Sequence, residues 1–101
     1  MLVHTVNFWL KKDLSSEEIA LFEKGVSSLQ NIEVVKYFSV GTPASTDRPT
    51  IDRTYSYSLL TVFEGMPGHD VYQTHPIHLQ FLADCKHLWE RVLIYDATSI
   101  Q

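Results

Sequence analysis

The fold of the second half of the chain depends on one segment, Tyr72-Gln73-Thr74-His75-Pro76-Ile77-His78. Pro76 has no amide hydrogen and a fixed φ, so it suits the first position of a helix. The residue before a proline is pushed out of the helical region, which predicts that one helix ends just before Pro76 and another begins there. Tyr72, His75 and His78 would then lie at the joint. Polar groups at a joint form a site or only fix the joint through hydrogen bonds, and the sequence leaves both interpretations open.

The composition is that of one globular domain spanning residues 1–101. The chain is 45% hydrophobic and 20% charged, which supports one modest core. A net charge of −4, without a run of Lys or Arg, argues against nucleic acid and anionic membranes as partners. The single cysteine, Cys85, excludes an internal disulfide and favours a reducing, cytoplasmic setting. No signal peptide is expected, and no apolar run approaches the about 20 residues that span a bilayer.

The hydrophobic pattern predicts four strands and two helical regions. Strands are expected over residues 3–10, 32–40, 55–63 and 92–97. Ser15 and Glu18 form a capping box that opens an amphipathic helix over residues 15–30. The broken helix is expected over residues 69–88. The polar stretch 42–53 is expected to be a loop, which is either a lid or an ordinary hairpin connection.

Several of the expected strands are apolar on both faces. Helices can cover only one face of a four-stranded sheet in a two-layer domain. The second face would leave a large apolar patch in water, which soluble monomers rarely expose. Face-to-face pairing of two copies removes this patch, and a symmetric dimer is the commonest oligomer. The sequence therefore predicts an α+β fold in which two sheets pair to close a shared barrel in a homodimer.

Three stretches resemble the stress-responsive dimeric α+β barrel (Dabb) domain family. They are Val3-His4-Thr5-Val6-Asn7-Phe8, the segment from Asp70 to His78, and Trp89-Glu90-Arg91-Val92-Leu93-Ile94-Tyr95-Asp96. The resemblance covers almost the whole chain and implies a ferredoxin-like antiparallel sheet that pairs with a second copy. Most members have no assigned activity. The chain is also similar to olivetolic acid cyclase-type polyketide cyclases, which perform an aldol-type condensation without a cofactor.

The similarity to the cyclases implies roles for individual residues. It makes His78 the general base and Tyr72 the residue that assists it. The family's strand-one histidine and final aspartate correspond to His4 and Asp96. Tyr57 departs from the pattern, because the cyclases have a histidine there. An imidazole titrates near neutrality and can take and return a proton, while a phenol can donate to an enolate oxygen.

The resemblance also indicates which side chains point into the barrel. They are His4, Val6, Phe8, Tyr57, Leu59, Val92, Ile94 and Asp96. The expected binding residues are these without Val92, together with His75. This set is mostly apolar with a few polar groups, as small-molecule sites usually are. Asp96 could orient His4 or His78 by accepting a hydrogen bond, or His4 and Asp96 could simply satisfy each other in the sheet.

Two functions stay open. One is a binding or stress-related homodimer that holds a small apolar or aromatic ligand, and the other is a cofactor-free enzyme acting on a small carbonyl compound. No cofactor and no metal are expected. A metal site would use His4, His75, His78 and Asp96. These residue types suit zinc, but no local spacing requires it. His69 is expected to be solvated at a helix start, and Cys85 to pack as a small apolar residue.

Overall fold

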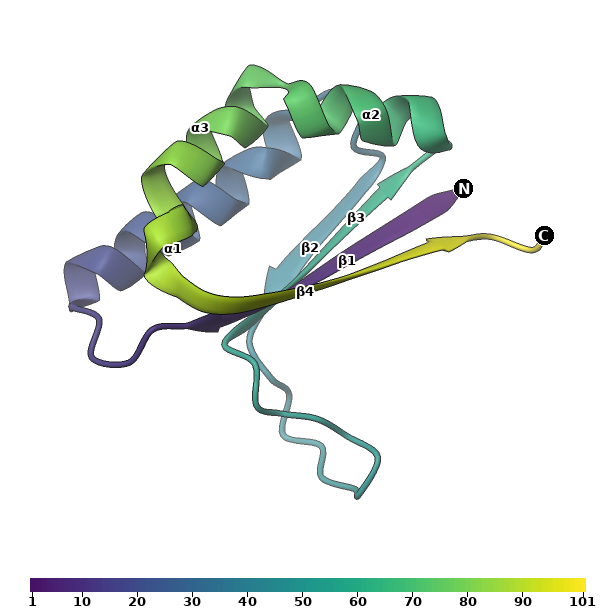
Figure 1. Ribbon diagram of the computed structural model, residues 1–101. Helices are drawn as coiled ribbons and strands as arrows, with labels where there is room; N and C mark the ends of the chain where they lie inside the picture. The colour runs from purple at the N-terminus through teal and green to yellow at the C-terminus, as the bar shows by residue number, and fades with distance from the viewer.

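The computed structural model describes residues 1–101 and contains one sheet and three α-helices (Figure 1). The elements are β1 (Leu2–Leu10), α1 (Ser16–Ser28), β2 (Tyr37–Gly41), β3 (Tyr57–Phe63), α2 (Met66–Thr74), α3 (Pro76–Cys85) and β4 (Trp89–Thr98), with 3-10 turns at Leu29–Asn31 and Lys86–Leu88. All strand pairs are antiparallel, in the order β2-β3-β1-β4. This is the predicted ferredoxin-like α+β fold. No helix is both long enough and apolar enough to span a lipid bilayer.

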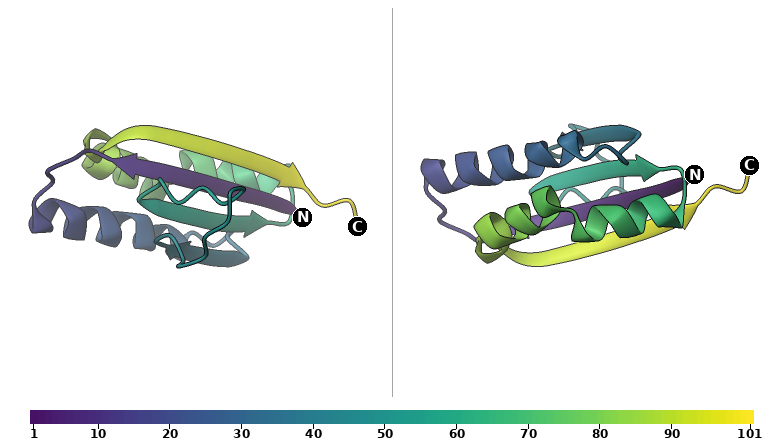
Figure 2. Two further views of the ribbon diagram at one scale, coloured as in Figure 1. Left: turned by 90° about the horizontal axis from the view of Figure 1, so that it is seen from below. Right: turned by 90° about the horizontal axis from the view of Figure 1, so that it is seen from above.

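The three helices cover one face of the sheet and leave the other bare (Figure 1). Figure 2 shows α1 on the β2–β3 side of that face and α2 with α3 on the β1–β4 side. The buried core lies between the two layers. Its strand residues include Leu2, Val6, Phe8, Leu59 and Phe63, and its helix residues include Phe22, Val26, Phe81 and Cys85. The expectation that Cys85 packs as an apolar residue is confirmed, and burial raises the pKa of its thiol to about 11.

The break in the second helical region lies where the sequence predicts it. α2 ends at Thr74, α3 begins at Pro76, and His75 between them is extended with φ −62° and ψ 139°. The region starts earlier than predicted, at Met66, with Gly65 as its N-cap and Pro67 in its first turn. Proline needs no amide partner in a first turn, so Gly65-Met66-Pro67 starts the helix where the sequence suggested only punctuation.

Several strand boundaries differ from the prediction. β2 begins at Tyr37, because the buried side chain of Ile32 ends the 3-10 turn and the chain then turns through Val35. β3 begins at Tyr57, and β4 is longer than expected. The capping box of Ser15 and Glu18 opens α1 as predicted.

The side chains expected to point into the barrel face the helices instead. In the antiparallel register His4 pairs with Asp96, and Val6 pairs with Ile94, so these residues share one face. That face carries α2 and α3, and the bare face carries the alternate residues. The structure therefore corrects the expectation: these side chains point into a space within one chain, not between the sheets of two copies.

The loop between β2 and β3 lies on the bare side of the sheet (Figure 1). Trp9 Nε1 donates to Thr54 Oγ1 at 3.0 Å, which ties the loop to β1. The Arg91 guanidinium lies 4.1 Å from the centre of the same indole ring. The helices are on the opposite face of the sheet. This loop therefore cannot act as a lid over the space between the helices and the sheet of the same chain.

Candidate functional site

One cavity lies between the sheet and the α2–α3 layer and has a volume of about 240 Å³. Ten of its 14 lining residues are hydrophobic, the composition expected of a small-molecule site. The predicted residues that line it are His4, Val6, Phe8, Leu59, Tyr72, His78, Val92 and Ile94. The structure thus brings both histidines and the tyrosine into one space with the apolar strand residues. Sequence reasoning missed the lining residues Leu29, Gln73, Phe81, Leu82, Lys86 and Trp89.

The cavity opens toward β4, the edge strand next to β1. Val92 and Ile94 line the cavity yet remain 40% and 50% exposed, because no further strand or helix covers this edge. Lys86, in the 3-10 turn before β4, lies exposed at the same opening. A molecule can therefore reach the cavity from solvent without unfolding a helix.

His78 projects from the first turn of α3 into this cavity. Its Nδ1 is buried and has no hydrogen-bond partner. Nε2 is neither buried nor bonded, so it is the ring nitrogen that a molecule in the cavity can reach. Burial lowers the pKa of His78, and repulsion from His4 lowers it further, while the backbone of Gln73 acts in the opposite direction. His78 is therefore neutral at pH 7 and able to accept a proton.

Tyr72 lies beside His78, in the last turn of α2. The two ring centroids are 4.8 Å apart, and the Tyr72 ring also contacts Phe63 at 5.0 Å. Only 1% of Tyr72 is exposed, and its hydroxyl makes no hydrogen bond within the chain. Burial raises the pKa of this hydroxyl well above its usual value. Tyr72 therefore stays protonated and offers a hydrogen-bond donor to the cavity.

His4 and Asp96 satisfy each other across β1 and β4. His4 is 3% exposed, and its Nδ1 is hydrogen-bonded to Asp96 Oδ1. Of the two partners expected for Asp96, the structure selects His4 over His78. A carboxylate only accepts, so Nδ1 of His4 donates the hydrogen to Asp96.

Three expected binding residues do not line the cavity, namely Asp96, which contacts it only through His4, and Tyr57 and His75. The Tyr57 hydroxyl donates to Glu23 Oε2 at 2.5 Å on the α1 side, and burial, followed by this bond, raises its pKa to about 12. His75 caps α3 by accepting from the Ile77 amide at 3.1 Å, and its Nε2 lies 3.3 Å from Glu33 Oε1. For His75, the interpretation that it fixes the joint through hydrogen bonds fits the geometry.

His69 departs from the expectation that it is solvated. Its side chain is only 16% exposed, and its ring packs edge-on against His4 with centroids 5.3 Å apart. Because α2 begins at Met66, His69 is in the middle of a helix and three residues before Tyr72, on the same side. The missed signal was Pro67, which marks the true helix start.

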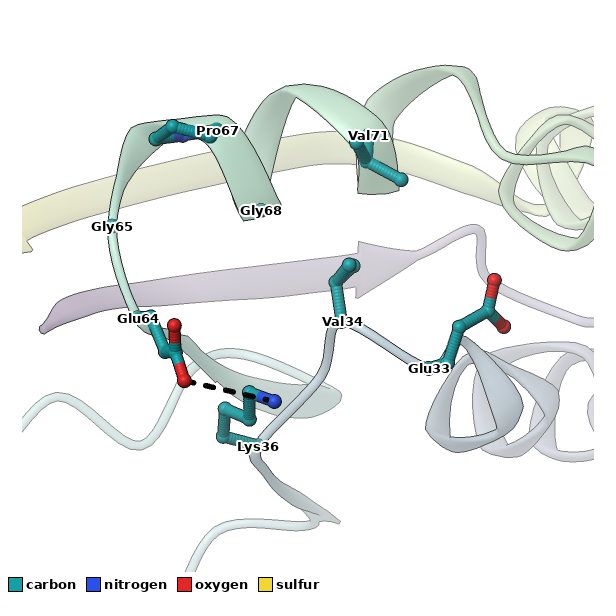
Figure 3. Close-up of a pocket in the computed structure, with 8 residues that line it drawn as sticks. All are labelled: Glu33, Val34, Lys36, Glu64, Gly65, Pro67, Gly68 and Val71. Carbon is teal, nitrogen blue, oxygen red and sulfur yellow. Dashed lines mark ion pairs between the residues drawn. The ribbon is translucent and has the colours of Figure 1, made fainter.

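A second, larger hollow carries no such chemistry. It measures about 550 Å³ and is lined by Glu33, Val34, Lys36, Glu64, Gly65, Pro67, Gly68 and Val71 (Figure 3). The one ion pair between two of its lining residues joins Lys36 Nζ to Glu64 Oε1 at 3.8 Å, and both side chains are exposed. Such pairs contribute little in water. The candidate site is therefore the smaller cavity beside His78.

The fold and this cavity define the chain as a ferredoxin-like α+β domain with a helix-side pocket. The model of the stress responsive A/B barrel domain (Dabb) matches residues 2–99, so the chain belongs to this family. The resemblance of the three stretches to that family is thereby confirmed. No curated protein is a significant match to the chain.

Solved structures share the fold over nearly the full length. A Dabb family protein from Mesorhizobium loti is 27% identical, with a TM-score of 0.79, covering 99% of this chain and 97% of that chain. A dimeric ferredoxin-like protein of unknown function from Thermobifida fusca is 17% identical, with a TM-score of 0.79 and coverages of 97% and 90%. The hydroxynitrile lyase of Passiflora edulis is 22% identical, with a TM-score of 0.76 and coverages of 95% and 90%.

Proposed function

We propose that this protein is a homodimer that binds a small, apolar or single-ring aromatic molecule in the cavity of each chain. The observation that carries the proposal is an open apolar cavity in which the polar groups of Tyr72 and His78 converge. An apolar cavity of about 150 Å³ holds benzene. The cavity here, at about 240 Å³, accommodates one ring with short substituents.

The proposed dimer joins the two bare sheet faces. Tyr95 on this face is 60% exposed, and two leucines of the same face, Leu60 on the inner strand β3 and Leu93 on the edge strand β4, are only half-buried. Three solved neighbours are described as dimeric, which supports a dimer but does not specify its interface. Light scattering on a size-exclusion column should give twice 11.6 kDa. A stable monomer at micromolar concentration would contradict this part of the proposal.

Ligand binding is tested by a thermal-shift screen with small aromatic acids and ketones. A ligand at 100 times its Kd stabilises the folded state by about 2.7 kcal/mol, which raises Tm by roughly 10–20 °C in a domain of this size. Ile94→Trp fills the opening and should abolish the shift. Val71→Trp is the matched control, because Val71 is 48% exposed on α2 and does not line the cavity. Equal shifts in both variants would place the ligand elsewhere.

A second candidate function is cofactor-free proton transfer, supported by the arrangement of Tyr72 and His78. The neutral His78 would remove a proton from the carbon next to a carbonyl, and Tyr72 would donate a hydrogen bond to the oxygen that gains charge. The enolate so formed would recover a proton from His78 or react with a second carbonyl carbon. One protein of similar fold, the hydroxynitrile lyase of Passiflora edulis, is an enzyme, which supports a fold able to host catalysis.

Proton transfer is tested separately from binding. A ketone that gives a thermal shift is incubated with the protein in D₂O, and loss of its α-proton signal is followed by NMR. His78→Gln should slow the exchange by about 10²-fold or more, and Tyr72→Phe should slow it less. Exchange no faster than in buffer would leave a binding protein without catalysis. Exchange unchanged in His78→Gln would reject His78 as the base.

A further inference from the structure

Three potential metal ligands from three separate elements meet at the inner side of the α2 layer. His4 lies on β1, His69 on α2 and Asp96 on β4, and one ligand atom of each lies within 4.8 Å of the other two. The grouping is not the one that the sequence suggested, since His75 and His78 take no part and His69 replaces them.

The two imidazoles are held in place before any ion binds. His4 is nearly fully buried in the sheet, opposite Thr61 on β3. The His69 ring packs edge-on against both His4 and Phe63, at centroid distances of 5.3 and 6.0 Å. Rings fixed in this way lose little side-chain entropy on binding an ion.

His69 also has the hydrogen bonds typical of a metal-ligating histidine. Its Nδ1 lies 3.3 Å from Asp70 Oδ1, and its Nε2 lies 3.3 Å from the side-chain nitrogen of Gln73. A carboxylate on one ring nitrogen fixes the tautomer and leaves the lone pair on the other, here Nε2. Gln73 occupies that lone pair in the ion-free chain and has a flexible side chain that can move aside.

We infer that His4, His69 and Asp96 bind one divalent first-row transition ion, such as Zn²⁺. Two imidazoles and a carboxylate with one open position form a ligand set that zinc adopts in proteins, whereas Mg²⁺ and Ca²⁺ prefer oxygen ligands alone. Tetrahedral bonds of about 2.1 Å place ligand atoms roughly 3.4 Å apart. The widest separation of 4.8 Å must therefore shrink by about 1.4 Å.

Asp96 is the most mobile of the three ligands, because its side chain is 43% exposed at the edge of the sheet. The ion would bind His4 through Nδ1 in place of the hydrogen that now points to Asp96, and the neutral ring would then carry its hydrogen on Nε2. The ion would lie beside the cavity, because His4 lines the cavity and its ring centroid lies 5.9 Å from that of Tyr72. The ion would bind whether or not His78 and Tyr72 act on a ligand.

Isothermal titration calorimetry of the EDTA-treated, dialysed full chain with ZnCl₂ tests the inference. One ion per chain is expected, and His69→Gln and Asp96→Asn should each weaken binding by about tenfold or more. His87→Gln is the control, because His87 is exposed in the 3-10 turn before β4 and outside the cluster. No binding, or equal affinity in His69→Gln and wild type, would reject the site.

A second measurement needs no variant. The ring signals of His4 and His69 should move in ¹H–¹⁵N NMR spectra when Zn²⁺ is added, while those of His75 and His87 stay unchanged. Shifts at His75 or His87 without shifts at His4 and His69 would show surface binding and contradict the inference.

Discussion

Gly25 in the middle of α1 provides a sharp test of the packing beside the cavity. A methyl group added at Gly25 would lie 2.7 Å from Cys85 Sγ and 3.1 Å from Phe81 Cδ1. Ordinary contacts are about 3.5–4.0 Å, so Gly25→Ala overlaps Sγ by roughly 1 Å. Cys85 is fully buried, so its sulfur has no solvent-filled space to move into. Overpacking lowers the free energy of unfolding by about 1–3 kcal/mol, whereas the higher helix propensity of Ala raises it by about 1 kcal/mol.

Gly25→Ala should therefore lower the free energy of unfolding by about 0–2 kcal/mol, although propensity alone predicts a gain. Urea denaturation at fixed protein concentration measures it, since a dimer's stability depends on concentration. Ala20→Gly, at an exposed position of α1, calibrates the propensity contribution. In a Cys85→Ala background, Gly25→Ala should become less destabilising by about 1–2 kcal/mol. A stabilisation of 1 kcal/mol in the wild-type background would refute the reasoning.

Three further predictions concern the site and the dimer. Because the pKa of His78 is lowered in the folded chain, the unfolded chain binds a proton more readily, and the free energy of unfolding should fall as the pH drops below about 6.5. His78→Gln should make the free energy of unfolding less dependent on pH, as measured by urea denaturation at pH 7.5 and 5.5. If the free energy of unfolding of His78→Gln depended on pH as strongly as that of the wild type, burial would not lower the pKa of His78. His75→Ala removes the cap on the Ile77 amide and should cost about 1 kcal/mol while leaving the ligand-induced thermal shift intact. Loss of the ligand-induced thermal shift in His75→Ala would show that His75 contributes to ligand binding. Tyr95→Asp puts a charge on the bare face and should yield monomers on a size-exclusion column, and a dimer of unchanged mass would point to another interface.

Local chemistry explains which parts of the fold were predictable. The helix break at Pro76 and the capping box at Ser15 and Glu18 depend on neighbouring residues alone, so the sequence displays them directly. The alternation of side chains along the strands indicated that both faces of the sheet are apolar. It did not indicate which face the helices cover. That choice depends on how the connections cross the sheet, which no single strand encodes.

The candidate site was also predictable only where it depends on residues close together in the sequence. Tyr72 and His78 are close in sequence and flank a break that proline fixes, so their shared cavity followed from local rules. Tyr57 shares a sheet face with Leu59 but sits at the strand end under α1, where Glu23 binds it. His69 was missed because its position depends on where α2 starts, and helix ends are the least certain part of a sequence reading.

The cavity and the bare face lie on opposite sides of one sheet, and this separates assembly from ligand capture. Joined through their bare faces, two chains would hold two pockets with a double layer of strands between them and no common chamber. Each pocket should then fill independently, with two equivalents per dimer and a Hill coefficient of one. A chain kept monomeric should retain its affinity, provided that it stays folded.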